Sequence, residues 1–250
     1  MHKKCAAQHH DVIYFCQSVR PKRTKNEATM SQPLYVFDLD NTLIDGDSST
    51  IFSRFLVREG YVSDPEYLLH EERLMLDYAR GEMDLQEYVA LILSPLIGLS
   101  RDDVDQLVAR CVQTDIRSRI YPQALALIQS LQAQHQPMLI ISASVSLLVK
   151  AIAPVLGIRH AIGIEIKMDN DRYTDIIDGT PSYQEGKITC LHHWLDAHPQ
   201  ANGPLTFYTD SINDLPLCLR ADEVFLVNPC SQLAAQGEQH RWPVLNWRLD

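Results

Sequence analysis

A short apolar run followed by two aspartates constrains this 250-residue chain more than any other feature. The run spans residues 34–37, and its length and composition predict a buried β-strand. Asp38 and Asp40 follow it directly, two residues apart. Because side chains alternate along a strand, the two carboxylates are expected to face the same way. In a parallel α/β sheet the position beyond the carboxyl end of a strand is where ligands bind.

Polar side chains also follow two later apolar runs. Ser142 comes after residues 138–141, and Asp210 comes after residues 205–209. Asp214 stands four residues beyond Asp210. Taken one at a time, these residues have ordinary explanations, because serine and aspartate are common caps of helices. Taken together, they predict several polar groups at one edge of a parallel sheet.

Lys187 begins an expected helix and follows Glu185 and Gly186. A lone lysine is usually a surface residue, so Lys187 is a candidate site residue only in combination with the other motifs. The order Asp-x-Asp-x-Thr, strand-end serine, Gly-Lys and Asp-x-x-x-Asp resembles the haloacid dehalogenase superfamily. Within it, the chain resembles the phosphatases with a helical cap inserted after the first motif, which include phosphoserine phosphatase-like and histidinol-phosphate phosphatase-like enzymes. The resemblance runs from about residue 33 to the C-terminal region.

This resemblance implies a role for each residue of the first two motifs. Asp38 is expected to be the nucleophile that forms an aspartyl-phosphate. Asp40 is expected to protonate the leaving alcohol and then activate water. Thr42 and Ser142 are expected to donate hydrogen bonds to phosphate oxygens. The residues after Ser142 are expected to open a helix whose free N–H groups favour an anion.

The resemblance also implies a metal ion, and Mg²⁺ suits hard oxygen ligands. Asp210 is expected to be a direct ligand, and Asp214 either a ligand or an outer partner. Lys187 is expected to bridge the phosphate and the nucleophile as a point charge. Asn213 is a weaker candidate for phosphate or substrate contact. The expected metal site comprises Asp38, Asp40 through its backbone carbonyl, Asp210 and Asp214.

Asp47 stands seven residues after Asp40. In similar small-substrate phosphatases an acidic residue at this position touches the substrate amine, although this chain has aspartate where the longer glutamate is usual. An N-cap role for the first cap helix explains Asp47 equally well. If Asp47 faces the site, an acidic pocket suits histidinol phosphate, which has an amine and an imidazole but no carboxylate. Phosphoserine, the second choice, also needs a cation, for which the candidates are Arg54, Arg58, Arg73 and Arg80.

The pattern of elements predicts an α/β protein with a Rossmann-like parallel sheet and a helical cap inserted after the first strand. The catalytic core is expected over residues 33–45 and 120–250. The cap is expected over residues 46–119, where helical patterns follow one another without a strand. Residues 1–32 are expected to be a leader that is disordered or that precedes a native start at Met30.

Local signals predict several boundaries. Asp64 and Pro65 predict the start of a cap helix that Gly81 ends. A buried strand is expected over residues 137–142. Residues 243–247 are apolar enough to pack on the core or to add an edge strand.

Composition excludes several classes of partner. The formal net charge of −10 argues against a broad basic surface for nucleic acid and against polybasic docking to a membrane. No apolar run approaches the roughly 20 residues of a transmembrane helix. The six cysteines include no Cys-x-x-Cys pair, so separate reduced thiols and a cytoplasmic location are expected.

These observations predict a Mg²⁺-dependent phosphatase that hydrolyses a small-metabolite phosphomonoester. Two other functions stay open at this stage. One is a phosphatase or phosphotransferase acting on a lipid or a macromolecule. The other is a non-catalytic scaffold of the same fold. The oligomeric state is not indicated by the sequence.

Overall fold

The structure is a computed structural model that describes residues 31–249. The leader expected before the core, with the alternative start at Met30, lies outside the described residues apart from Ser31 and Gln32. The described residues contain a six-stranded sheet in which every neighbouring pair is parallel. In spatial order its strands are β3 (His160–Ile164), β2 (Met138–Val145), β1 (Leu34–Phe37), β6 (Leu205–Thr209), β7 (Glu223–Val227) and β8 (Val244–Leu245).

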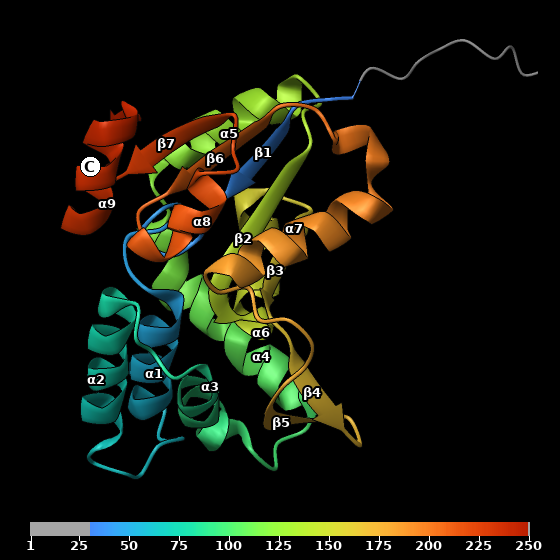
Figure 1. Ribbon diagram of the computed structural model, residues 1–250. Helices are drawn as coiled ribbons and strands as arrows, with labels where there is room; N and C mark the ends of the chain where they lie inside the picture. Colours follow the sequence, from blue (N-terminus) through green and yellow to red (C-terminus); the bar gives the residue numbers. More distant parts are fainter. Residues whose placement is uncertain (1–30, 250) are drawn as a thin grey trace, which may run out of the picture.

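Helices cover both faces of this sheet (Figure 1). Because neighbouring residues of a strand point to opposite faces, Val36 and Phe37 belong to two different apolar clusters. Phe37 packs in the cluster of α5 (Pro122–Ala133) and α6 (Ser146–Leu156). Val36 packs in the cluster of α7 (Glu185–Ala197), α8 (Leu215–Cys218) and α9 (Ser231–His240). The predicted α/β class is therefore confirmed.

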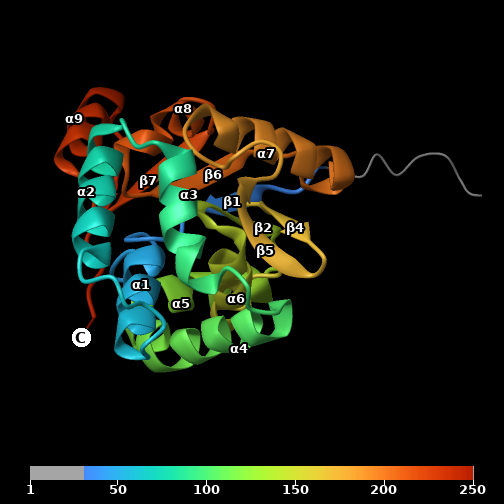
Figure 2. The ribbon, with the colours of Figure 1, turned by 90° about the horizontal axis from the view of Figure 1, so that it is seen from below.

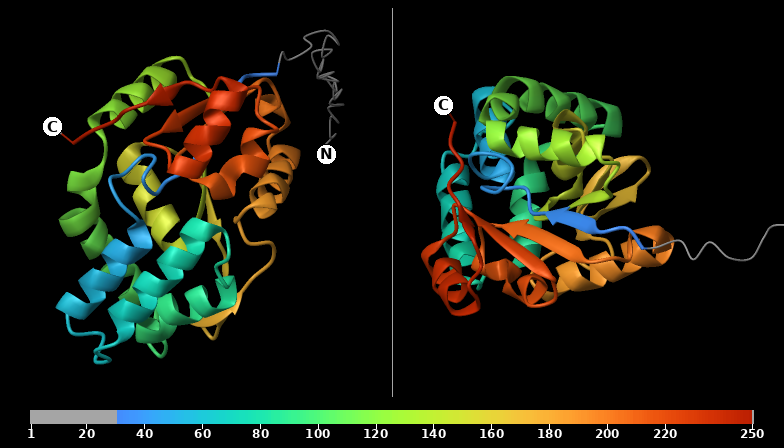
Figure 3. Two further views of the ribbon diagram at one scale, coloured as in Figure 1. Left: turned by 60° about the vertical axis from the view of Figure 1, so that its left-hand side comes forward. Right: turned by 90° about the horizontal axis from the view of Figure 1, so that it is seen from above.

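The order of the strands brings distant parts of the chain together. In the right-hand view of Figure 3 the blue strand β1 lies beside the orange strand β6, and Phe37 is in register with Tyr208. On its other side β1 pairs with β2. The residues that follow β1, β2 and β6 therefore meet at one edge of the sheet, as expected for parallel strands.

Four helices follow β1 and precede α5, and Figure 2 views the molecule from the end that they occupy. Their N-caps include Asp47, Asp84 and Ser100. Ser100 Oγ accepts from the Asp103 amide and donates to the Asp103 carboxylate. The division of the chain into a core domain and a cap domain stays a prediction. The four helices are α1 (Ser48–Arg58), α2 (Tyr67–Arg80), α3 (Leu85–Leu93) and α4 (Arg101–Cys111).

The predicted start of α2 was wrong, although Gly81 ends this helix as expected. The Asp64 carboxylate accepts a hydrogen bond from the Glu66 amide at 2.9 Å, which closes a turn ahead of the helix. The helix begins at Tyr67, and its N-cap residue Glu66 makes no side-chain capping bond. Asp64 therefore does accept a hydrogen bond from the backbone, but in the turn that precedes the helix.

The predicted end of β2 was also wrong. The strand continues through Val145, which pairs with Ile164 of β3 after a shift in register. Gly163 permits this approach, since a Cβ there would lie 2.7 Å from the Ser144 carbonyl oxygen. Ser142 consequently lies inside the strand, and the next helix, α6, begins only at Ser146. The anion-binding helix terminus expected directly after Ser142 is absent.

Two smaller elements complete the described chain. The strands β4 (Ile166–Asp169) and β5 (Arg172–Ile177) form an antiparallel hairpin that packs against α3, as Figure 2 shows. The C-terminal tail adds β8 beside β7, which confirms the expected edge strand. Beyond β8, the Trp247 side chain is buried and meets the Tyr121 ring edge-on at 6.2 Å.

No helix in the described range 31–249 is both long enough and apolar enough to cross a membrane.

Candidate active site

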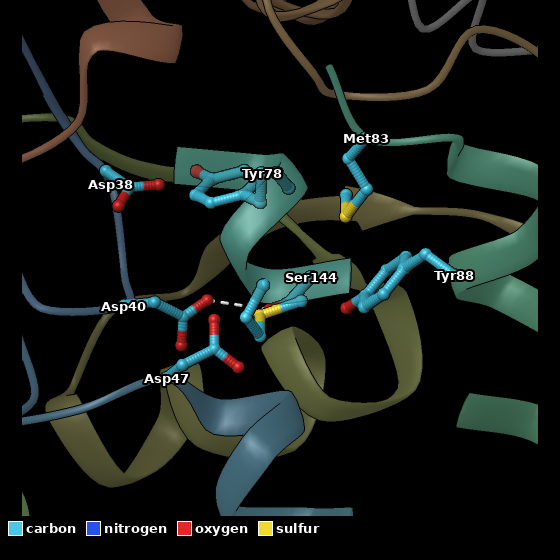
Figure 4. A pocket seen from close by; sticks show the side chains of 9 residues that line it. Asp38, Asp40, Asp47, Tyr78, Met83, Tyr88 and Ser144 are labelled. Atoms are coloured by element: carbon cyan, nitrogen blue, oxygen red, sulfur yellow. Dashed lines mark hydrogen bonds between the residues drawn. The ribbon is translucent and has the colours of Figure 1, made fainter. Parts of the chain in front are cut away.

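The loop after β1 places Asp38 and Asp40 in the wall of the same cavity (Figure 4). The loop turns tightly, because the Leu39 carbonyl accepts a hydrogen bond from the Leu43 amide at 2.8 Å. Asn41 has a φ angle of 53°, a left-handed conformation that asparagine tolerates better than most residues. The expectation that both carboxylates face one site is confirmed.

Lys187 binds two of the expected site carboxylates. Its Nζ atom lies 2.8 Å from Asp38 Oδ1 and 2.6 Å from Asp214 Oδ1. Gly186 allows this approach, since a Cβ there would lie 1.9 Å from the Pro181 carbonyl oxygen. Burial by itself lowers the pKa of Lys187, but Asp214 and Asp38 outweigh that effect and hold it above its usual value. Lys187 is therefore a protonated, fully buried cation.

The carboxylates of the last motif also lie in this network. Thr42 Oγ1 donates to Asp210 Oδ1 at 3.2 Å. Asp214 Oδ2 accepts a hydrogen bond from Thr209 Oγ1 at 2.6 Å, so both Asp214 oxygens are engaged. Burial, with the nearby negative charge of Asp38 and Asp214, raises the pKa of Asp210 well above its usual range. The site therefore holds more buried carboxyl groups than Lys187 alone can keep ionised.

This excess of buried carboxyl groups is the feature that fits a divalent cation, whose charge would keep them ionised. The available donors are hard oxygens, chiefly the carboxylates of Asp38 and Asp210, which suit Mg²⁺. Among residues 31–249, no three His, Cys, Asp or Glu side chains are grouped so as to hold a metal ion by themselves. Mg²⁺ is compatible with such a site, since it commonly keeps several waters and uses only one or two carboxylates.

Asp40 is held by hydrogen bonds to both of its carboxylate oxygens. The Ser48 amide donates to Oδ1 at 2.7 Å. The hydroxyls of Ser144 and Ser142 donate to Oδ2 at 2.6 and 3.2 Å. Burial raises the pKa of Asp40 to about 6, the Asp47 charge adds to this effect, and the hydrogen bonds oppose it. A carboxyl group with this pKa can both give and take a proton near neutral pH.

The cavity above these groups is small, with about 280 Å³ of empty space including its mouth. Tyr78 and Met75 of α2 also contribute to its wall. Ser144 was not singled out from the sequence, although it stands two residues after Ser142 on a strand and shares its face. None of the nine lining residues is a cation; they are Asp38, Asp40, Asp47, Met75, Tyr78, Met83, Tyr88, Ala143 and Ser144.

The N-cap interpretation of Asp47 is confirmed, and its contact with a substrate amine stays a prediction. Its carboxylate caps α1 by accepting a hydrogen bond from the Thr50 amide at 2.8 Å, and it also lines the cavity. Burial raises the pKa of Asp47 to about 6, and the nearby charge of Glu71 adds to the shift. Glu71 is itself buried and accepts a hydrogen bond from the Thr50 hydroxyl. Two acidic side chains therefore lie close together on this side of the cavity.

Asn213 is buried but occupies a different position. Its Nδ2 atom donates to the Tyr78 carbonyl oxygen at 2.8 Å, which ties the loop after β6 to α2. Its Oδ1 atom accepts from Tyr183 and Gln184, each at 3.3 Å. Asn213 does not belong to the cavity lining, and its contact with substrate stays a prediction.

Comparison with known proteins agrees with this fold. The profile of the haloacid dehalogenase-like hydrolase family matches residues 35–218. A protein of Neisseria meningitidis called histidinol-phosphatase is 34% identical over 219 residues, which cover 86% of this chain and 99% of that one.

Solved structures give the same result. A Bordetella pertussis protein of unknown function has a TM-score of 0.79 and 29% identity, covering 86% of this chain and 99% of that one. A substrate-bound phosphoserine phosphatase has a TM-score of 0.61 and 16% identity, covering 82% and 90% of the two chains, and it shares the fold. From the family profile and the 34% identical relative, we conclude that this chain belongs to the haloacid dehalogenase-like hydrolase family.

Proposed function

We propose that this protein is a Mg²⁺-dependent phosphatase that hydrolyses a small phosphomonoester through an aspartyl-phosphate. The observation that carries the proposal is the buried Asp38–Lys187–Asp214 network, which adjoins Asp40 at the base of one small cavity. A nucleophile, a proton-transfer group and a fixed cation are the parts that phosphoryl transfer requires.

In the first step, Asp38 attacks phosphorus and the leaving alcohol takes a proton from the Asp40 carboxyl group. In the second step, ionised Asp40 takes a proton from water, which attacks the phosphorus of the aspartyl-phosphate and regenerates Asp38. Lys187 neutralises charge on Asp38 and phosphate throughout. Thr42 and Ser142 are the proposed hydroxyl donors to phosphate, and binding requires them to turn from their present partners, Asp210 and Asp40.

The side chains of Asp38 and Asp210 and the backbone carbonyl of Asp40 are the proposed ligands of Mg²⁺. Asp214 is better suited to an outer role, because Lys187 and Thr209 engage its two oxygens. When bound, the metal would supply positive charge that lets an anionic nucleophile approach a phosphate dianion.

The cavity favours an amine-bearing substrate without a carboxylate. Asp47 offers a negative charge to an ammonium group, and no cation lines the wall to receive a carboxylate. Of the arginines considered as carboxylate partners, Arg58 and Arg73 are paired with other acidic residues, and so is Arg80. We therefore propose histidinol phosphate as the first substrate and phosphoserine as the second.

The substrate proposal is tested by comparing kcat/KM for histidinol phosphate, phosphoserine, sugar phosphates and nucleotides. We expect kcat/KM for histidinol phosphate to exceed that for phosphoserine by at least about tenfold, because a carboxylate placed beside like charges costs roughly 1.4 kcal/mol or more. The Asp47→Asn variant keeps a capping side chain but loses the charge. It should lose activity on histidinol phosphate and not on a sugar phosphate. A preference of the parent enzyme for sugar phosphates or nucleotides would defeat the substrate proposal.

The covalent mechanism is tested with Asp38→Asn, which removes the nucleophile and nearly preserves its shape. Turnover should be abolished while the circular dichroism spectrum is unchanged. Addition of Mg²⁺ to metal-depleted parent enzyme should restore turnover, and Asp210→Ala should weaken the Mg²⁺ affinity measured by calorimetry. Retained turnover in folded Asp38→Asn would rule out the aspartyl-phosphate.

The two other functions left open by the sequence are less well supported. The small cavity leaves little room for a lipid or a macromolecule as substrate. The assembled network of acidic groups around Lys187 has no evident use in a non-catalytic scaffold. The cytoplasmic location stays a prediction.

A further inference from the structure

A continuous chain of buried hydroxyl groups leads from the proposed general acid into the inserted helices. Ser144 Oγ donates to Asp40 Oδ2 at 2.6 Å. Ser49 Oγ lies 3.3 Å from Ser144 Oγ and 2.5 Å from the Tyr88 hydroxyl. A fourth hydroxyl, that of Ser48, also donates to Ser144 Oγ at 3.1 Å. Figure 4 shows the link between Asp40 and Ser144 and the nearby Tyr88 side chain.

The direction of these hydrogen bonds follows from the chemistry of the carboxylate. An ionised carboxylate only accepts hydrogen bonds, so the single Ser144 proton points to Asp40. Ser144 Oγ can then only accept from its other neighbours. The consistent arrangement is that Tyr88 donates to Ser49, and Ser49 donates to Ser144. Every proton of the chain therefore points toward Asp40, an arrangement in which each bond strengthens the next.

Ser142 cannot replace Ser144 once substrate is bound. A serine hydroxyl has one proton, and in the proposed reaction Ser142 gives it to a phosphate oxygen. Asp40 Oδ2 then retains Ser144 as its hydroxyl partner. The Ser48 amide still holds Oδ1, so two fixed donors define the plane of the carboxyl group.

We propose that Ser144 is the positioning residue for Asp40, and that Ser49 and Tyr88 hold its hydroxyl in the required direction. This inference rests on the proposed phosphatase function. Ser144 belongs to β2, while Ser49 and Tyr88 belong to α1 and α3. Tyr88 also lines the cavity. The orientation of the general acid thus depends on hydroxyl contacts that link two inserted helices to a strand of the sheet, at the wall where the organic part of a substrate would bind.

The inference is tested by the dependence of kcat/KM on the leaving group. Departure of an alkoxide from histidinol phosphate requires a proton, whereas p-nitrophenolate leaves from p-nitrophenyl phosphate without one at neutral pH. Ser144→Ala should lower kcat/KM for histidinol phosphate by about 10- to 100-fold, the range expected for a lost hydrogen bond to a charged group. For p-nitrophenyl phosphate the loss should be less than about threefold, because Asp40 has little part in that first step.

A second measurement reports on the water-attack step. In Ser144→Ala, Asp40 is also a poorer base, so hydrolysis of the aspartyl-phosphate should become slow for either ester. Rapid mixing with p-nitrophenyl phosphate should then show a burst of p-nitrophenol equal to the enzyme concentration. Tyr88→Phe, which removes only the far hydroxyl, should show the same leaving-group pattern with a smaller loss.

Ser146→Ala is the matched control, because Ser146 is also a buried serine and follows Ser144 by two residues. Its kcat/KM for both esters should stay within about twofold of the parent value, as for a substitution away from the site. Equal losses on the two esters in Ser144→Ala, or no loss on either, would overturn the positioning role while leaving the phosphatase proposal intact. A parent enzyme inert toward both esters with Mg²⁺ would overturn both.

Discussion

Lys187 is the residue on which the charge balance of the site depends. It is buried between Asp38 and Asp214, and the carboxyl group of Asp210 lies nearby. A buried ion pair contributes little net stability, but removal of one partner leaves the other charge without compensation. The lysine therefore has a structural role in addition to its proposed contact with phosphate.

Lys187→Met should consequently destabilise the protein as well as abolish turnover. We expect the free energy of unfolding to fall by about 3 kcal/mol, as for other broken buried pairs. Urea denaturation without added metal measures this change. Lys150→Met is the control, because its pair with Glu165 is exposed and should contribute less than about 1 kcal/mol. Similar losses in the two variants would contradict a buried-charge explanation.

The raised pKa of Asp47 should make the free energy of unfolding of the protein depend on pH. Its pKa is raised to about 6 in the folded protein, mainly by burial, so folding favours the protonated form. The stability from this group is fully present below the unfolded pKa, near 3.8, and is lost as pH rises through about 6. Asp40 shows the same direction of shift.

When the pH is raised from about 5 to about 7.5, the free energy of unfolding of the Asp47→Asn variant should therefore fall less than that of the parent. Asparagine keeps the cap of α1, so the comparison isolates the charge. Urea denaturation at the two pH values gives the difference, which should be on the order of 1 kcal/mol. Parallel pH profiles for the two proteins would show that Asp47 titrates normally.

Among the elements, the β4–β5 hairpin connects the sheet side of the molecule to the inserted helices. The Gln86 side chain of α3 donates to the Asp175 carbonyl oxygen at 2.5 Å. The Arg101 amide of α4 donates to the Asp171 carbonyl oxygen at 3.1 Å, and Arg172 donates to the Gly98 carbonyl oxygen. The hairpin thus restrains the helix that carries Tyr88.

Replacement of residues 168–175 by a short Gly-Ser turn should loosen α3 without unfolding the sheet. Amide hydrogen exchange should become faster in α3 and stay unchanged in β1 and β6, because local opening depends on local contacts. The Gln86→Ala variant keeps the hairpin and removes only the hydrogen bond to Asp175. It should accelerate exchange in α3 by a smaller amount. Unchanged exchange in α3 would mean that α1 and α2 hold it without the hairpin.

At the scale of the whole molecule, the C-terminal tail forms the edge of the sheet beside β7. The Asn228 side chain donates to the Trp247 carbonyl oxygen and accepts from its amide, both at 3.1 Å. A second cavity, open to solvent, is lined by Trp247 and by residues that include Asp210. The tail therefore covers the sheet edge beside a proposed metal ligand.

Trp247→Ala should lower the free energy of unfolding by about 3 kcal/mol, the low end for removal of a buried aromatic side chain. Guanidinium denaturation measures the change. Leu249→Ala is the control, because Leu249 is exposed and its loss should cost less than about 0.5 kcal/mol. A Trp247→Ala protein as stable as the control would show that β8 and its backbone bonds suffice.

The sequence by itself determined the features that depend on neighbours in the chain. Alternation along a strand placed Asp38 and Asp40 on one side, and the apolar runs predicted the parallel sheet. The end of α2 was predicted correctly because Gly81 provides a local cap. These features follow from backbone geometry and short-range hydrogen bonds, which a few adjacent residues settle.

Only the tertiary structure decided which groups meet. The end of β2 depends on its pairing with β3, and the partners of Lys187 lie on other elements. The cavity is built from β2, the loop after β1 and two inserted helices, so no single segment contains its pattern. The link from Ser144 to Tyr88 likewise exists only because packing brings their hydroxyls together. Such contacts are set by the packing of many side chains at once, and that packing leaves no local signal in the sequence.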